Sequence, residues 1–251
     1  MLFSPGLYLP MGKKPAVAGG SEATVLIDVS TSGILANSNN GVTSYIIAGG
    51  STPNIGSGPN GTSNLCLLAA GMFGSQNGGT STFGGGGNGL FWDTAGANQQ
   101  FTQVPGAFIQ NGASGGDTYL FYLMNPVQGS KAFSMNWTGA NALSVAFASF
   151  VNVDQTGGTT SFPSVVTNSG TANPPSVTIS TSPTTRKIIG AFSSPSNFSA
   201  PAGAANDIGR NIGMNVFAVA ADWDLGSAAS IGYSTGSSSA FVGLAAAIKG
   251  A

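Results

Sequence analysis

Histidine is absent from this 251-residue chain, and cysteine occurs once. Without histidine there is no Ser-His-Asp or Cys-His triad, no imidazole zinc site and no imidazole base for catalysis near neutral pH. The lone thiol, Cys66, lies in the apolar run 65–70, where a buried core residue is expected, and no disulfide framework supports the fold. We therefore expect a protein that is not an enzyme and that needs no cofactor or metal ion.

Charge is equally scarce, with 7 Lys and Arg against 8 Asp and Glu and a formal net charge of −1. A nucleic-acid binder needs many cations to neutralise phosphates, and the pairs Lys13-Lys14 and Arg186-Lys187 are too few. No run of about 18 apolar residues could span a membrane as a helix, and the first 15 residues lack the features of a signal peptide. Neither nucleic acid nor membrane is an expected partner.

Glycine and proline are abundant instead, with 39 and 13 residues, and Ser, Thr and Asn fill much of the remainder. These residues disfavour helices, whereas a hydrophobic fraction of 41% is too high for a disordered chain. The composition therefore predicts an all-β protein, an antiparallel, jelly-roll-like β-sandwich with long Gly-rich loops. The length permits one large sandwich or two small ones, and we expect a single domain over 21–251 behind an N-terminal arm over 1–20.

Short apolar runs alternate with Gly, Asn and Ser clusters along this domain, which is the pattern of strands joined by turns. Runs 143–151 and 241–248 are apolar on both faces, and this indicates central strands packed between layers. No repeat of fixed period emerges, which argues against a solenoid or a propeller. The segments with the clearest strand pattern are 23–29, 42–48, 64–73, 89–92, 118–123, 131–137, 143–151, 176–180, 187–192, 213–223, 230–233 and 240–249.

Two Gly-rich tracts, 49–61 and 84–89, lie between expected strands and are interpreted as long loops. No Lys-Ser/Thr pair follows 84–89 and no helix is expected to begin behind it, so a phosphate-binding loop is not predicted there.

The N-terminal arm carries prolines at positions 5, 10 and 15 and apolar side chains that would be unfavourable in water. We expect it to be extended and to lie either against its own domain or, as the favoured alternative, against a partner subunit. Its candidate partner-binding residues are Leu2, Phe3, Leu7, Tyr8, Leu9 and Met11.

Segment 119–137 is predicted to form a β-hairpin, because Asn125-Pro126 ends one apolar run and Gly129-Ser130 permits a turn into the next. The aromatic side chains of the two strands would then be buried on a common face. Trp92 and Trp137 are interpreted as packing residues, with stacking on a sugar ring as the alternative.

Acidic residues are the remaining candidates for chemistry, and only Asp222 and Asp224 form a pair. On one strand they would share a face, where they could hold Ca²⁺ or act as a glycosidase pair beside Trp223. A hard cation needs about six oxygen ligands, which this spacing does not supply. The favoured interpretation is a solvated strand end or a salt bridge to Arg210 or Arg186.

Several motifs follow one another in a recognisable order. They are Leu-Leu-Ala-Ala-Gly-Met at 67–72, Phe-Thr-Gln-Val at 101–104, and the segments 119–137, 146–156 and 241–249. This order resembles the Gly/Ser/Thr-rich β-sandwich modules of phage virion and bacterial surface proteins. The resemblance implies a β-sandwich fold and a place on such a surface. The segment 213–225 and the N-terminal arm depart from the family pattern, so the resemblance implies no mode of attachment.

Two functions are expected on these grounds. The first is a phage virion structural protein, a capsid decoration or cement protein that binds the shell through its arm and its sandwich edges. The alternative is a carbohydrate-binding attachment module of a tail or head fibre, with loops 98–100 and 110–111 contacting glycans. The expected location is the virion surface, and the expected partners are major capsid or tail proteins and copies of the chain itself in a homo-oligomer, with a trimer as the expected order.

Overall fold

The computed structural model describes residues 23–30, 35–37, 44–73, 89–111, 116–136, 143–180, 187–194, 198–202, 206–211, 217–224 and 229–251. Within these residues the chain forms eighteen strands and one short α-helix, α1 (Gly158–Ser161). All pairings between these strands are antiparallel. The all-β, sandwich-like fold predicted from the composition is confirmed.

Two large sheets form the centre of the described structure, and we call them the inner sheets. The first inner sheet has the order β1-β10-β4-β8-β7, with β2 also paired to β10; the bounds in that order are Leu26–Ser30, Leu143–Val151, Cys66–Phe73, Gly116–Met124, Thr102–Asn111 and Leu35–Asn37. The second inner sheet has the order β11-β18-β13-β16-β15, with bounds Ser164–Ala172, Ser239–Ile248, Lys187–Ser194, Phe217–Asp224 and Asn206–Asn211.

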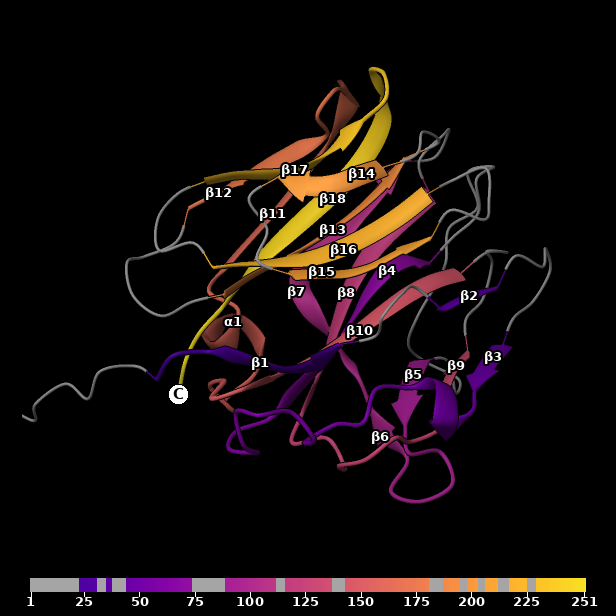
Figure 1. The fold of residues 1–251 in the computed structure, drawn as a ribbon, viewed down its shortest axis with the longest axis vertical. Helices are drawn as coiled ribbons and strands as arrows, with labels where there is room; N and C mark the ends of the chain where they lie inside the picture. Colours follow the sequence, from indigo (N-terminus) through magenta and orange to yellow (C-terminus); the bar gives the residue numbers. More distant parts are fainter. Residues whose placement is uncertain are drawn as a thin grey trace, which may run out of the picture.

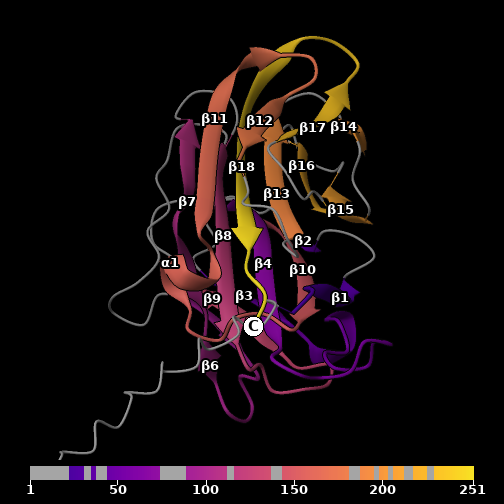
Figure 2. The ribbon, with the colours of Figure 1, turned by 90° about the vertical axis from the view of Figure 1, so that its left-hand side faces the viewer.

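Two smaller sheets cover the outer faces, and we call them the outer sheets. The first outer sheet has the order β3-β9-β5-β6, with bounds Ser44–Ile47, Phe133–Asn136, Gly89–Trp92 and Gln99–Gln100. The second outer sheet has the order β12-β17-β14, with bounds Ser176–Ile179, Ala229–Thr235 and Phe198–Ala202. The second outer sheet lies at the top of Figure 1 and the first at the lower right, and Figure 2 shows the long inner strands running side by side.

Alternation of side chains along β10 shows why the inner sheets are apolar on both faces. Val145, Phe147 and Val151 belong to a core shared with the first outer sheet, which we call the first outer core. Ala146, Ala148 and Phe150 point the other way, into a core shared with the second inner sheet, which we call the middle core. The prediction that 143–151 is a central strand between layers is confirmed, with the predicted bounds.

The second inner sheet repeats this arrangement. Along β18, Ala246 and Ile248 lie in the middle core, whereas Ala245 and Ala247 lie in a second outer core against β12 and β17. The run of alanines is therefore a strand and not a helix, as predicted, and small side chains on both faces let three layers pack closely.

The predicted hairpin over 119–137 is wrong, although its residues do share a core. β8 pairs with β4 and β7, while β9 pairs with β3 and β5 in the first outer sheet. Segment 125–132, which joins β8 to β9, is too long for a tight turn and carries the chain from one layer to the next. Phe121 and Phe133 consequently belong to the same first outer core, although their strands lie in different sheets and are not paired.

Replacing Phe147 by Ala should lower the free energy of unfolding by about 3–5 kcal/mol, because it removes a fully buried ring from the first outer core. The ring centroid of Phe147 lies 4.8 Å from that of Phe133 and 6.4 Å from that of Trp92. Urea denaturation measures the change. Ile46→Ala, at a side chain 70% exposed, is the control and should change stability by less than about 0.5 kcal/mol; equal losses in the two variants would contradict the layer assignment.

Candidate functional site

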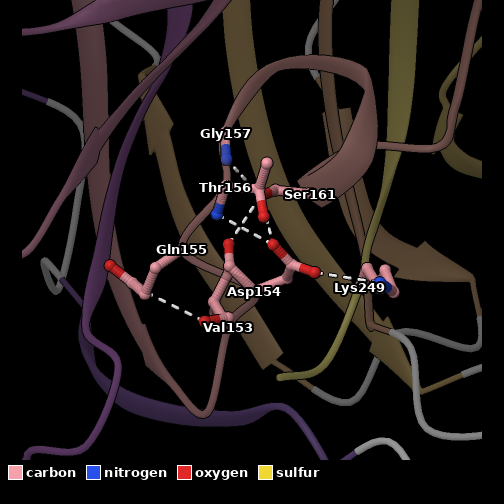
Figure 3. A network of polar contacts seen from close by, with 7 residues as sticks. All are labelled: Val153, Asp154, Gln155, Thr156, Gly157, Ser161 and Lys249. Atoms are coloured by element: carbon pink, nitrogen blue, oxygen red, sulfur yellow. Dashed lines mark hydrogen bonds and ion pairs between the residues drawn. The ribbon is translucent and has the colours of Figure 1, made fainter.

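A connected cluster of polar contacts lies in the turn that follows β10 (Figure 3). Asp154 accepts a 2.8 Å hydrogen bond from the Thr156 amide through Oδ1 and forms a 2.9 Å ion pair with Lys249 Nζ through Oδ2. Ser161 donates its hydroxyl proton to the Asp154 carbonyl at 2.5 Å and accepts from the Gly157 amide at 2.8 Å. The cluster fixes the corner between β10 and β11 to the C-terminal end of β18.

The ion pair sets the electrostatics of this turn. The hydrogen bond from Lys249 lowers the pKa of Asp154 to about 2, with further lowering by the Thr156 side chain and amide, although partial burial opposes the shift. The carboxylate is therefore ionised throughout the physiological range.

Serine, lysine and aspartate also occur together in nucleophilic enzymes, so the chemistry of this cluster must be considered. A nucleophilic serine needs an accessible hydroxyl and a base that takes its proton. Ser161 is fully buried, and its proton is directed at a backbone carbonyl. The arrangement binds the chain to itself and leaves Ser161 no route to a substrate.

Gln155 extends the same turn into the core. Its amide group donates to the carbonyls of Val153 at 2.9 Å and Leu65 at 3.3 Å, which joins the turn to the start of β4. Within the described structure its Oε1 is buried and has no hydrogen-bond partner. A single acceptor without a partner does not make a binding site.

A second carboxylate, which is buried, organises the loop before β4. Asp28, 5% exposed, accepts hydrogen bonds from the amides of Gly56 at 2.7 Å and Gly58 at 2.8 Å and from the Ser149 hydroxyl at 2.6 Å. A Cβ atom on Gly58 would lie 2.2 Å from the Asp28 carbonyl oxygen, so only glycine fits this approach. The Gly-rich tract 49–61 is thus a loop held onto β1 and β10.

Two of the side chains proposed for sugar contact, Trp92 and Gln99, form hydrogen bonds within the protein. Trp92 is fully buried and donates its indole N–H to the Val127 carbonyl at 2.8 Å, which confirms its packing role. Gln99 donates to the Asn125 carbonyl at 3.1 Å and accepts from the Val127 amide at 2.7 Å. Both side chains fix the 125–132 segment to the first outer sheet.

Cys66 is a buried core thiol, as predicted. It lies in the middle core with no exposed surface, and burial raises the pKa of its thiol far above the ordinary value. The thiolate that a reactive cysteine requires is therefore not formed in the folded protein.

The remaining candidates are placed only in part. Asp222 and Asp224 lie two residues apart on β16, and their backbone partners on β13 are Ile189 and Lys187. The apolar arm residues Leu2, Phe3, Leu7, Tyr8, Leu9 and Met11, like Trp137, lie outside the described residues. Where the structure is described, no three His, Cys, Asp or Glu side chains gather as a metal site would require.

The sequence pattern does not predict the two carboxylate clusters. Asp28 and Asp154 belong to the acidic residues that are candidates for chemistry, and in the structure they bind backbone amides. The order Asp-Gln-Thr-Gly-Gly at 154–158 contains a signal for the second cluster, because Asp before Gly commonly caps a turn. Nothing local marks Asp28, whose partners lie about thirty and 121 positions away along the chain.

Comparison with known proteins supplies no relative: no family model, curated protein or solved structure matches the chain. Across the described residues no helix has the length and apolar character needed to span a membrane.

Replacing Lys249 by Met should reduce stability at neutral pH by about 1 kcal/mol or less, since the ion pair is partly exposed. Ion pairing lowers the pKa of folded Asp154 from 3.8 to about 2, so the contribution is complete above pH 4 and is lost as the pH falls toward 2. Urea denaturation of both proteins between pH 7 and pH 2 tests this. Lys131→Met, at a lysine outside the cluster, is the control; a Lys249→Met deficit that is as large at pH 2 as at pH 7 would contradict the assignment.

Proposed function

We propose that the protein is a non-enzymatic structural protein of a phage virion surface, a capsid decoration protein. The observation that carries the proposal is that clustered polar side chains form hydrogen bonds within the protein itself. In the described structure the clustered polar groups of Asp28, Gln99 and Asp154 bind the protein's own backbone. Side chains committed in this way stabilise loops and leave no reactive constellation, as expected of a protein that acts through its surface.

The exposed edges of the sheets support the same proposal. β11 is an edge strand of nine residues, and its side chains over 167–171 are exposed and uncharged. β3 is an edge strand of the first outer sheet and exposes Ile46. Edges that carry no charge present backbone groups and small apolar surface to a neighbouring protein, and such contacts suit attachment to a shell and to other copies.

The carbohydrate-binding alternative has weaker support in the described residues. Trp92 and Gln99 are engaged internally, and the side chains at 110–111 lie outside what the structure describes. An aromatic platform and free amide groups are the features that sugar binding would need. Purified protein on a glycan array provides the direct test, and specific binding there would favour the attachment module over the decoration protein.

Removing residues 1–15 should leave a folded protein that no longer enters virus particles, because the apolar arm is the proposed anchor. Mass spectrometry of purified particles would measure copy number, and circular dichroism would check the fold. A matched pair keeps the length constant: serine at Leu2, Phe3, Leu7, Tyr8, Leu9 and Met11 should abolish incorporation, whereas serine at Lys13 and Lys14 should not. Normal incorporation of the truncated protein would remove the arm from the proposal.

The full-length protein should form a homo-oligomer, with a trimer as the proposed order. A net charge of −1 provides little repulsion between copies, and weak contacts repeated in an oligomer gain avidity on a shell. Light scattering at micromolar concentration measures the mass in solution, and cross-linking measures it on particles. A monomer in both settings would contradict the prediction.

A further inference from the structure

The two inner sheets follow one connection pattern. Numbered along the chain, with β2 counted as a continuation of β1, the strands of the first inner sheet are β1, β4, β7, β8 and β10. Their spatial order, β1-β10-β4-β8-β7, runs first, fifth, second, fourth, third. The second inner sheet, built from β11, β13, β15, β16 and β18, has the order β11-β18-β13-β16-β15, which is the same sequence of ranks.

The outer sheets extend the match. β3, β9 and β5 are neighbours in the first outer sheet. Along the chain they come after the first, the fourth and the second strand of the first inner sheet, respectively. β12, β17 and β14 are neighbours in the second outer sheet and occupy the same places in the chain. When β6 is counted with β7, each half has eight antiparallel strands that cross between two sheets, as in a jelly roll.

Contacts between the halves are also paired. β4 lies against β13, its counterpart. β8 contacts β13 and β18, and its counterpart β16 contacts the counterparts of those strands, β4 and β10. In the same way β7 contacts β18, and its counterpart β15 contacts β10. Exchanging each strand for its counterpart converts one set of contacts into the other, which is the mark of a twofold axis beside β4 and β13. The contact of β7 with β11 is additional.

We infer that the chain is an internal duplication, two jelly-roll modules over 23–153 and 164–251 joined face to face about a pseudo-twofold axis. Each module has its own core, the first or the second outer core, and the middle core is an interface between modules. The partner that each inner face fits is a second module of the same topology. This inference is independent of a role in a virion.

The residues of the middle core support a permanent interface. Its apolar members include Ala146, Ala148, Ala191 and Ala246, whose small side chains allow close approach of the sheets. Its buried hydroxyls meet across the interface, with 3.0 Å between Thr118 Oγ1 and Ser193 Oγ, so neither is buried without a hydrogen bond. A face of this kind would be a large apolar patch if exposed, as in an obligate dimer.

Two adjacent alanines on β18 provide a matched test, because Ala246 lies in the middle core and Ala247 in the second outer core. Ala246→Arg should separate the modules but leave each fold intact. The strand signal in circular dichroism should be retained, while the reaction of Cys66 with a thiol reagent should accelerate at least about 100-fold. Ala247→Arg should disrupt the core of the second module and lose strand signal. Loss of strand signal in both variants, or an unreactive Cys66 in Ala246→Arg, would overturn the inference.

Cleavage of the full chain supplies a second test that needs no core substitution. A protease site between Thr159 and Thr160, both exposed in α1, divides the chain between modules, and a site between Gly61 and Thr62 divides it within the first module. Both cut chains are unfolded in urea and refolded by dilution, and the fraction that regains native protection of Cys66 is measured. For the chain cut between modules this fraction should be within about twofold of that of the uncut protein, and for the chain cut within the first module it should be at least about tenfold lower than that of the uncut protein. Recovery of the first no better than that of the second would overturn the inference.

Discussion

The middle core is the constraint on which the rest of the described structure depends. Because the inner sheets cover each other on one face and the outer sheets on the other, their central strands bury side chains on both faces. Alternation of polar and apolar residues is therefore lost in β10 and β18, and small residues replace large ones where layers approach most closely. The same burial isolates Cys66 from solvent and requires Thr118 and Ser193 to hydrogen-bond each other.

Once the inner sheets are fixed in this way, the loops between layers must satisfy their own backbone groups. The chain does so with very few charges, and the carboxylates of Asp28 and Asp154 each receive backbone amides. A buried carboxylate with this role is poorly placed for catalysis, because its lone pairs are occupied. These two carboxylates therefore serve the fold, because each holds loop backbone in place.

Sequence reasoning succeeded for central strands and failed mainly at edges. β5 and β10 have the predicted bounds, and β4, β13 and β18 differ by a few residues. The strands that were missed, β2, β6, β7, β11, β14 and β15, all lie at the edges of sheets. An edge strand buries less of its surface, so β11 can carry Thr, Asn, Ser and Gly over 167–171 with no apolar alternation to reveal it. Packing roles of Cys66 and Trp92 were predictable from apolar neighbours, whereas Asp28 depends on contacts with distant segments that no local pattern encodes.

The absence of a visible sequence repeat is compatible with two modules of one topology. What the pseudo-twofold contact requires is a pattern of sizes, and residues of different identity supply it. On β4, Leu68 and Ala70 present a large and then a small side chain to the middle core, and on β13 Ile189 and Ala191 do the same. Because packing selects volume and not identity, such a pattern can persist after sequence similarity has disappeared. The strand order is retained more strongly still, since changing it would require every buried face to find a new partner.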